Sequence, residues 1–346
     1  MTRRKKILII YTGGTIGMVQ RKRDGSYIPF DFKGIRSEFP ELDQLDCELD
    51  IHSFDPPLDS SNIGPDIWVQ IARTIADNYV EFDGFVVLHG SDTMAYTGSA
   101  LSFMLEGLAK PVIFTGAQVP IQEIRTDAKE NLVTAIQIAS HPEQPIKEVA
   151  IYFGTKLFRA NRTKKMHADV FSAFDSPNLP PLVEAGVHLY FRHQTPEDAF
   201  QGFRFKVQDK LESRIGHARF YPGLPFDNLD SILHHPGTRG IILQSFGAGN
   251  LPTNDAIAAS IKKSIEMGKI ILNITQCSGG SVEMGRYATS AMLLKNGVLS
   301  GVDLTFEAAL TKMMYLMGKY EDPEEVRYYL VRNIRGEMRA DRAYTT

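Results

Sequence analysis

Glycines and hydroxyl-bearing residues directly follow several short apolar runs of this 346-residue chain. In chain order these segments read Thr12-Gly13-Gly14-Thr15, His89-Gly90-Ser91-Asp92-Thr93, Thr115-Gly116-Ala117-Gln118, Ser245-Phe246-Gly247 and Thr275-Gln276-Cys277-Ser278. Glycine lets backbone N–H groups approach a ligand closely, and hydroxyl groups serve as nucleophiles or hydrogen-bond donors. One such segment is ordinary turn chemistry. Three of them in the first half of the chain predict a site for a small polar ligand.

The apolar runs alternate with longer segments of helical periodicity. The runs predict strands over Ile7–Tyr11, Phe85–Leu88, Val112–Phe114, Val149–Phe153, Gly240–Leu243 and Ile270–Ile274. The periodic segments predict helices over Pro65–Tyr79, Thr93–Leu108, Asp127–Ala139, Asn254–Met267, Thr305–Met317 and Glu324–Ile334. This alternation of strands and helices predicts an α/β fold with mostly parallel sheets covered by helices. Ligands bind at the carboxyl ends of the strands in such sheets, so we expect the active site there.

The length and one change of composition predict two domains. At about 150 residues per domain, the chain is long enough for two. The alternation of predicted strands and helices stops between Arg192 and Glu212, where the sequence is polar and has no clear period. We therefore expect a larger, catalytic N-terminal domain over residues 1–191, a linker over 192–212 and a C-terminal α/β domain over 213–346.

Composition and charge exclude several classes of protein. The chain is 43% hydrophobic and 23% charged, and its net charge is 38 − 41 = −3, which argues against a nucleic-acid partner. Its two cysteines form no disulfide framework or zinc-site spacing, and the scattered histidines argue against a metal site. The basic start is followed by an apolar run too short for a signal peptide, and no run approaches a membrane span. These features predict a cytoplasmic protein with no membrane partner.

Ordinary structural roles compete with catalytic ones at each segment. Thr12-x-Gly14-x-x-Gly17 is one glycine short of a dinucleotide-binding fingerprint, and the acidic residue expected about 20 positions later is not evident. Thr15 fits a helix cap by residue type, and Ser91-Asp92 fits the cap of the helix expected from Thr93. Lys165 lies in a basic cluster of a kind that is usually solvated. Spacing alone leaves these alternatives open.

Two segments together resemble the signatures of bacterial-type L-asparaginases. They are Thr12-Gly13-Gly14-Thr15-Ile16-Gly17 and His89-Gly90-Ser91-Asp92-Thr93-Met94. Three further segments are similar to the cytoplasmic type I branch of that family: Asn161-Arg162-Thr163-Lys164-Lys165, Ser176-Pro177-Asn178-Leu179-Pro180-Pro181-Leu182 and Thr275-Gln276-Cys277. The resemblance runs from about Lys6 to the last helix. Independent helix caps would not reproduce both signatures in this order.

The resemblance implies a catalytic set. Thr15 matches the threonine that attacks the side-chain amide and forms an acyl-enzyme, and Ser91, Asp92 and Lys165 match the family's Thr-Asp-Lys group. Ser91 is a departure, because the family usually has threonine there; serine keeps the hydroxyl and loses a methyl group. Tyr27 matches a tyrosine that orients the nucleophile from a mobile loop.

The resemblance also implies how substrate is held. Asp59, Ser60 and Ser61 match a loop that binds the α-amino and α-carboxylate groups, and Ser91 and Asp92 contribute to the same subsite. The polar stretch Gln20–Pro29, which contains a glycine, is typical of a lid that excludes water. A neighbouring subunit completes the site in this family, so a homodimer or homotetramer is implied. No cofactor is implied.

An effector site for asparagine is implied in the second domain. Thr275 and Cys277 fit its pattern. Gln244 stands where we expect the arginine that pairs with the effector carboxylate, so that charge-assisted contact is missing. The sequence therefore predicts weak or absent substrate cooperativity.

The function implied is L-asparagine amidohydrolase, which converts asparagine and water to aspartate and ammonia. A glutaminase-asparaginase or a related amidotransferase subunit is the alternative of the same fold, because one methylene group separates the two substrates. A catalytically inactive amino-acid sensor is the alternative that is not an enzyme. Release of ammonia from asparagine and glutamine distinguishes the three.

Overall fold

A computed structural model describes residues 3–20, 27–29, 39–143, 146–192, 204–252, 254–285 and 288–339. Side chains are described for these residues except 18–20, 27–29, 288 and 289. The described residues group into two compact units, one containing those up to 192 together with 204–209, the other those from Lys210 onward. Part of the linker expected over 192–212 lies outside the described residues, at 193–203.

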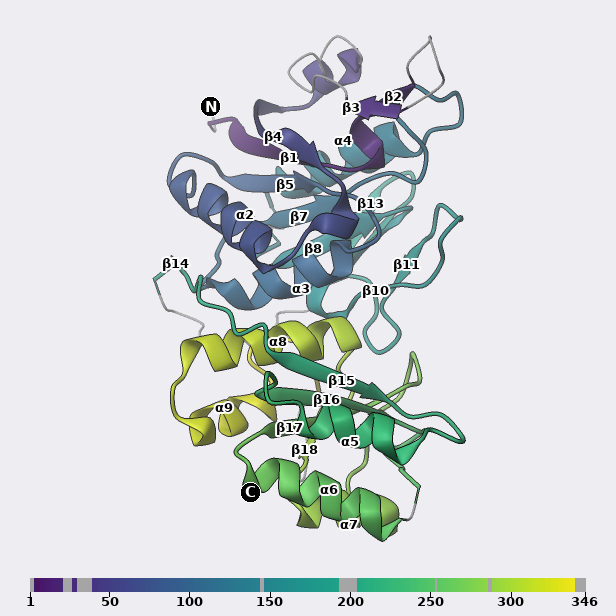
Figure 1. Ribbon diagram of the computed structural model, residues 1–346. Coiled ribbons are helices and arrows are strands. Elements are labelled where there is room, and N and C mark those ends of the chain that lie inside the picture. The colour runs from purple at the N-terminus through teal and green to yellow at the C-terminus, as the bar shows by residue number, and fades with distance from the viewer. Residues whose placement is uncertain are drawn as a thin grey trace. The chain divides into compact units, whose positions relative to one another are not determined.

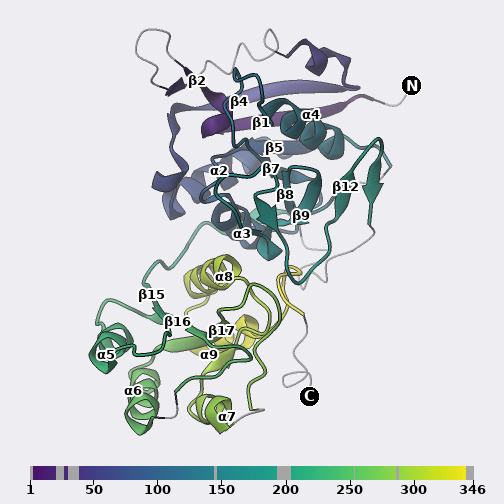
Figure 2. The same cartoon turned by 90° about the vertical axis from the view of Figure 1, so that its right-hand side faces the viewer.

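The first unit is built on one mixed sheet with the strand order β13-β12-β9-β8-β7-β5-β1-β4 (Figures 1 and 2). Its parallel strands are β1 (Lys5–Gly13), β4 (Cys47–Leu58), β5 (Gly84–Leu88), β7 (Val112–Thr115) and β8 (Val149–Phe153). The antiparallel strands are β9 (Lys156–Arg159), β12 (Val183–Ala185) and β13 (Leu189–Phe191). Strands β5, β7 and β8 are buried along their whole length, which explains why they read as continuous apolar runs.

Helices cover both faces of this sheet. They are α2 (Pro65–Asp77), α3 (Met94–Met104) and α4 (Ala128–Ala139). The apolar side of α4 packs on one face, in a core with alternate residues of the strands such as Ile9, Val86 and Ile113. On the other face, Gly98 of α3 lies against Ile151. Figures 1 and 2 show α4 on the opposite side of the sheet from α2 and α3.

Shorter elements complete the first unit. The two-stranded sheets pair β2 (Met18–Gln20) with β3 (Tyr27–Pro29), β6 (Leu105–Glu106) with β14 (Lys206–Val207), and β10 (Lys164–Lys165) with β11 (Phe174–Asp175). Short 3-10 helices span Thr15–Gly17, Pro40–Gln44, Ser60–Asn62 and Ala160–Arg162. Two of these follow directly from strands of the main sheet and carry predicted site residues.

The second unit is a parallel sheet in the order β15-β16-β17-β18. Its strands are β15 (Ile215–Arg219), β16 (Gly240–Ser245), β17 (Ile270–Thr275) and β18 (Leu299–Ser300). Its helices are α5 (Phe226–His234), α6 (Asp255–Glu266), α7 (Ala288–Lys295), α8 (Phe306–Lys319) and α9 (Pro323–Leu330). Residues of α5, α6 and α7 share a core with Ile241 and Ile271, whereas Met313 and Met317 of α8 lie against Gly240.

The predicted α/β fold is confirmed, with corrections to single elements. The helix expected over Thr93–Leu108 ends at Met104, because Leu105 and Glu106 leave the helix to pair with β14. The sequence reading missed β4, an edge strand whose residues alternate between buried and exposed over its first half, so it lacks the continuous apolar run of a central strand. It also missed the antiparallel strands β9, β12 and β13.

The described part of the chain shows neither a membrane-spanning helix nor a metal-binding cluster. None of its helices is both long enough and apolar enough to cross a membrane. No group of three or more His, Cys, Asp or Glu side chains in this part is arranged to hold a metal ion.

Candidate active site

The carboxyl ends of three neighbouring strands, β4, β1 and β5, bring the first predicted segments to one edge of the sheet. Tyr11 of β1 is paired in register with Leu88 of β5, and Gly13 with Leu58 of β4. The strands are parallel, so the segments that follow them leave the sheet at the same edge. This register positions the residues after Gly13, Leu58 and Leu88 beside one another.

The turn after β1 distinguishes its two threonines. Thr12 is fully buried, and its hydroxyl donates to the carbonyl of Leu88 at 2.9 Å, so it holds the two strands together. Thr15 begins the 3-10 helix Thr15–Gly17 and is partly exposed. No hydrogen bond joins its hydroxyl to another residue of the described ranges. Of the two, Thr15 is the one available to a ligand.

Glycine is required where this turn meets the segment after β5. Gly14 has a φ of +88°, and a Cβ atom there would lie 2.5 Å from the backbone nitrogen of Gly90. Gly17 packs against the ring of Tyr11, whose hydroxyl donates to the Gly17 carbonyl at 3.2 Å. Burial raises the pKa of Tyr11 to about 12, so this hydroxyl stays a donor at neutral pH.

Ser91, Asp92 and Lys165 form a hydrogen-bonded cluster. The Lys165 Nζ atom lies 2.9 Å from Ser91 Oγ and 2.6 Å from Asp92 Oδ1. The Lys165 side chain is 17% exposed, whereas that of Asp92 is 69% exposed. The ammonium is therefore held inside the cluster, and the carboxylate is open to a ligand. The alternative of Lys165 as part of a solvated basic surface does not fit these contacts.

The loop after β4 closes over the same segment. Asp59 Oδ1 accepts from the backbone nitrogen of Ser61 at 2.9 Å and caps the 3-10 helix Ser60–Asn62. Ser60 is buried, and its carbonyl accepts from the Thr93 hydroxyl at 2.7 Å. A Cβ atom on Gly90 would lie 2.5 Å from Ser60 Oγ. This loop therefore packs against the segment that carries Ser91 and Asp92.

Tyr27 is placed only by its backbone. It pairs with Gln20 between β3 and β2, and β2 follows directly after Gly17. Its side chain, and residues 21–26 of the expected lid, lie outside the described parts of the structure.

Sequence reasoning gave no role to His89, which is completely buried. Its Nδ1 atom lies 2.7 Å from the Gly90 carbonyl, and its Nε2 atom 2.9 Å from the Thr97 hydroxyl, which also accepts from the Trp68 indole at 3.1 Å. Because a carbonyl only accepts, Nδ1 carries the proton and Nε2 accepts from Thr97. Burial lowers the pKa of His89 to about 4, so the imidazole is neutral at neutral pH. It is this neutral ring that donates to the Gly90 carbonyl. Its position directly after an apolar strand was the available signal.

The predicted effector residues also gather at strand ends, in the second unit. Gln244 on β16 accepts from His217 Nε2 at 3.0 Å. The Thr275 hydroxyl on the adjacent β17 donates to the Gly247 carbonyl at 2.7 Å and accepts from the Cys277 nitrogen at 3.1 Å. The side chains of Gln244 and Thr275 are thus engaged within the protein, and Cys277 is exposed.

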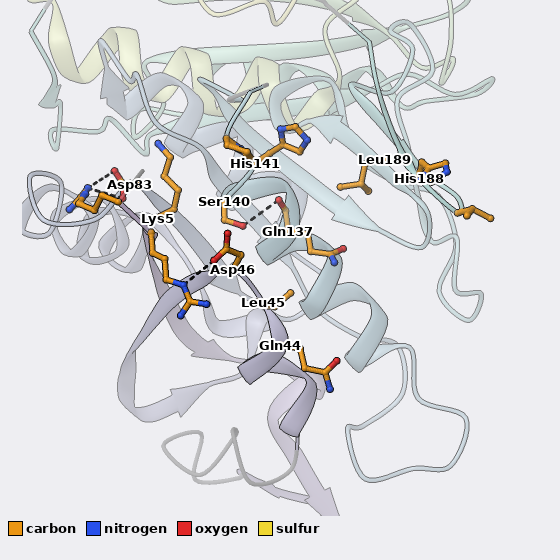
Figure 3. A pocket seen from close by; sticks show the side chains of 14 residues that line it. Lys5, Gln44, Leu45, Asp46, Asp83, Gln137, Ser140, His141, His188 and Leu189 are labelled. Atoms are coloured by element: carbon orange, nitrogen blue, oxygen red, sulfur yellow. Dashed lines mark hydrogen bonds and ion pairs between the residues drawn. The ribbon is translucent and has the colours of Figure 1, made fainter. Parts of the chain in front are cut away.

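A separate hollow of about 1080 Å³ lies at the other end of the first sheet, where the strands begin (Figure 3). It contains none of the predicted site residues. Arg3 and Arg4 on its wall are bound to Asp83 and Asp46, each at 2.9 Å. The candidate nucleophile-type residues converge at the carboxyl ends of the strands and not here.

Comparisons with known proteins define the class. The family model for the asparaginase N-terminal domain matches residues 6–197, and the model for the glutaminase/asparaginase C-terminal domain matches residues 214–330. The chain belongs to the asparaginase family.

Individual relatives match nearly the whole chain. It is 44% identical to L-asparaginase 1 of Escherichia coli K12 over 341 residues, which cover 98% of this chain and 99% of that protein. The crystal structure of L-asparaginase I from Vibrio cholerae is 43% identical, has a TM-score of 0.89, and the match covers 97% of this chain and 100% of that one. A glutamyl-tRNA(Gln) amidotransferase subunit of Pyrococcus abyssi is 31% identical over 96% of this chain and 76% of that protein.

Proposed function

We propose that this protein hydrolyses the side-chain amide of L-asparagine to give aspartate and ammonia. The observation that carries the proposal is the cluster of Ser91, Asp92 and Lys165 beside the turn that presents Thr15. An amide is cleaved by a nucleophile, a group that moves protons and donors that stabilise an oxyanion, and this edge of the sheet offers all three. The names of the E. coli and V. cholerae relatives support asparagine as the substrate.

In the first half-reaction, the Thr15 oxygen attacks the amide carbon of the substrate. The bond between that carbon and the amide nitrogen breaks, the threonine proton is transferred to the leaving nitrogen, and ammonia departs from a threonine ester. Backbone N–H groups of the glycine-containing turns stabilise the tetrahedral oxyanion. One such donor is typically worth about 10²–10³-fold in rate.

In the second half-reaction, water attacks the ester carbon, the bond to Thr15 breaks, and the threonine recovers its proton. Ser91 and Lys165 polarise the hydroxyl groups that take part. General acid–base assistance of this kind is worth about 10²–10⁴-fold. The substitution of serine for the usual threonine keeps the hydroxyl in this role.

The α-amino and α-carboxylate groups of the substrate are bound by residues that border the cluster. The Asp92 carboxylate is exposed and pairs with the α-ammonium group. The loop Asp59–Ser61 packs against the same segment and supplies hydroxyl, amide and carboxylate groups for the remaining contacts. The roles of Tyr27 and of the lid expected over Gln20–Pro29 stay predictions from the sequence.

Glutamine is the competing substrate. It is longer by one methylene group, which a pocket discriminates by only about 1–3 kcal/mol. The similarity to an amidotransferase subunit supports the alternative of an amidase with a broader range of substrates. The cytoplasmic location and the homodimeric or homotetrameric state stay predictions from the sequence.

Ammonia release from asparagine and from glutamine at matched concentrations tests the proposal. We expect turnover with asparagine to exceed that with glutamine. Equal or greater turnover with glutamine would establish the glutaminase-asparaginase alternative. Substrate binding without ammonia release from either amino acid would establish a sensor.

A further inference from the structure

Gln118 lies next to the Ser91–Asp92–Lys165 cluster but has no part in the mechanism above. It follows β7, the neighbour of β5, and its Oε1 atom lies 3.2 Å from Ser91 Oγ. Its Nε2 atom lies 3.0 Å from the carbonyl oxygen of Ala168 and 3.2 Å from that of Val170. One side chain thus joins Ser91 to the segment that follows Lys165.

The orientation of the Gln118 amide is determined by these partners. Both carbonyls only accept hydrogen bonds, so the NH₂ group must face them and uses both of its hydrogens there. The opposite orientation would place Oε1 against two carbonyl oxygens and leave both without a donor. The Gln118 oxygen therefore faces Ser91.

This orientation determines where the Ser91 hydroxyl proton points. A lysine ammonium has only donors, so Ser91 Oγ accepts from Lys165 Nζ at 2.9 Å. The single hydroxyl hydrogen is then donated to Gln118 Oε1. Gln118 holds Ser91 in the arrangement in which the serine oxygen, and not its proton, faces Lys165.

The backbone of Gln118 is itself fixed. Its nitrogen donates to the Asp127 carboxylate at 3.0 Å, and the same carboxylate accepts from the backbone nitrogen of Val119 and from Asn131. Asn131 also donates to the Gly116 carbonyl at 2.9 Å. Because its backbone is fixed at the end of a buried strand, the Gln118 side chain can hold Ser91 and the carbonyls of Ala168 and Val170 in place.

The segment that Gln118 binds is short and carries Lys165. Strands β10 and β11 form a hairpin, which is closed further by the bond from the Met166 nitrogen to the Ala173 carbonyl at 2.7 Å. Ala168 and Val170 lie between those residues. Fixing their carbonyls therefore limits the movement of Lys165 relative to Ser91.

We propose that Gln118 is a positioning residue of this active site, which orients the Ser91 hydroxyl and ties the β10–β11 hairpin to it; this inference rests on the proposed function. Gln118 acts on the chemical step and not on substrate affinity. Its loss affects turnover only as long as Ser91 is present.

The test is a double-mutant cycle followed by ammonia release from asparagine. Gln118→Met keeps the size of the side chain and removes all three hydrogen bonds. We expect it to lower kcat about 10- to 100-fold, with KM changed less than about threefold, because misplaced catalytic groups cost this order of rate. In a Ser91→Ala background, the same substitution lowers kcat by less than about threefold, since coupled residues are not additive.

Two further variants keep the test decisive. Gln70→Met, made at an exposed position of α2, is the matched control and retains wild-type kcat. Gln118→Glu keeps an acceptor for Ser91 but cannot donate to the two carbonyls, so it also loses turnover. Thermal unfolding midpoints within a few degrees of wild type show that each protein is folded, and Gln118→Leu, which also removes all three hydrogen bonds, replaces Gln118→Met in the cycle should the latter not fold.

The outcomes separate this inference from the proposed function. Wild-type kcat in Gln118→Met, or an equal loss in both backgrounds, overturns the positioning role while leaving the proposed function intact. Wild-type turnover in Ser91→Ala overturns the role proposed for Ser91 and, with it, that of Gln118.

Discussion

The ammonium nitrogen of Lys165 lies 2.9 Å from the hydroxyl oxygen of Ser91, across 74 positions of the chain. The lysine side chain is largely withdrawn from water, so its part-buried contact with Ser91 is less screened than that of a surface pair. A charge held in this way polarises the hydroxyl group beside it. The relationship makes Lys165 the part of the site most sensitive to a loss of charge.

Replacing Lys165 by methionine keeps the length of the side chain and removes the ammonium. We expect kcat for asparagine to fall about 10²–10⁴-fold, the range of general acid–base contributions. Lys164→Met is the matched control on the same strand and is expected to retain wild-type turnover. Similar kinetics for both variants would contradict the role of Lys165.

The Gly14 turn has no room for a side chain. Gly14→Ala places a methyl group 2.5 Å from the Gly90 nitrogen at a φ of +88°, so the turn or the Ser91 segment must shift. We expect a loss of stability of about 1–3 kcal/mol and a marked fall in turnover. Gly64→Ala, where no atom lies within 4 Å of the new methyl group, serves as the control. Urea unfolding and ammonia release check both effects, and an unperturbed Gly14→Ala enzyme would show that the close approach is not needed.

The buried His89 makes stability depend on pH. Its pKa falls from 6.5 to about 4 on folding, so the unfolded chain binds more protons between these values. The free energy of unfolding is therefore unaffected by His89 well above pH 6.5, and it falls as the pH drops from 6.5 toward 4, because only the unfolded chain takes up the proton there. Between pH 6.5 and pH 5, we expect the wild type to lose about 2 kcal/mol more than His89→Gln. Urea unfolding at both pH values measures this difference, and parallel losses in the two proteins would refute it.

The second unit offers no positive charge at Gln244 for an effector carboxylate. This side chain is buried and hydrogen-bonded to His217, so we expect asparagine to give a hyperbolic saturation curve. Initial rates over a wide range of asparagine concentration check this expectation. A clearly sigmoidal curve would show that the unit responds to substrate without that contact.

The parallel part of the fold could be predicted because a strand that is buried on both faces consists of consecutive apolar residues. Strands buried on both faces, such as β5 and β8, read as uninterrupted apolar runs. Strand β4 at the edge of the sheet has no such apolar run, because only part of it is buried. The rule that ligands bind beyond strand ends predicted that the candidate residues would gather at one edge of the sheet, and the segments after β4, β1 and β5 do meet there.

The contacts within the site could not be predicted from spacing. Lys165 reaches Ser91 from a two-residue strand of a hairpin, whose path depends on tertiary contacts such as those of Gln118. Only the resemblance to known asparaginases linked these residues beforehand. His89 and Gln118 lie in two of the segments that follow apolar runs, where a ligand site was predicted. Nothing in their residue types distinguished a positioning role from a structural one.

The proposed function depends on Thr15 as the nucleophile that attacks the amide of asparagine. Its most direct test is ammonia release from asparagine by Thr15→Ala, with circular dichroism to establish that the variant is folded. We expect a fall in turnover of at least about a thousandfold, as for the loss of other catalytic nucleophiles. A folded Thr15→Ala protein with wild-type turnover would contradict it.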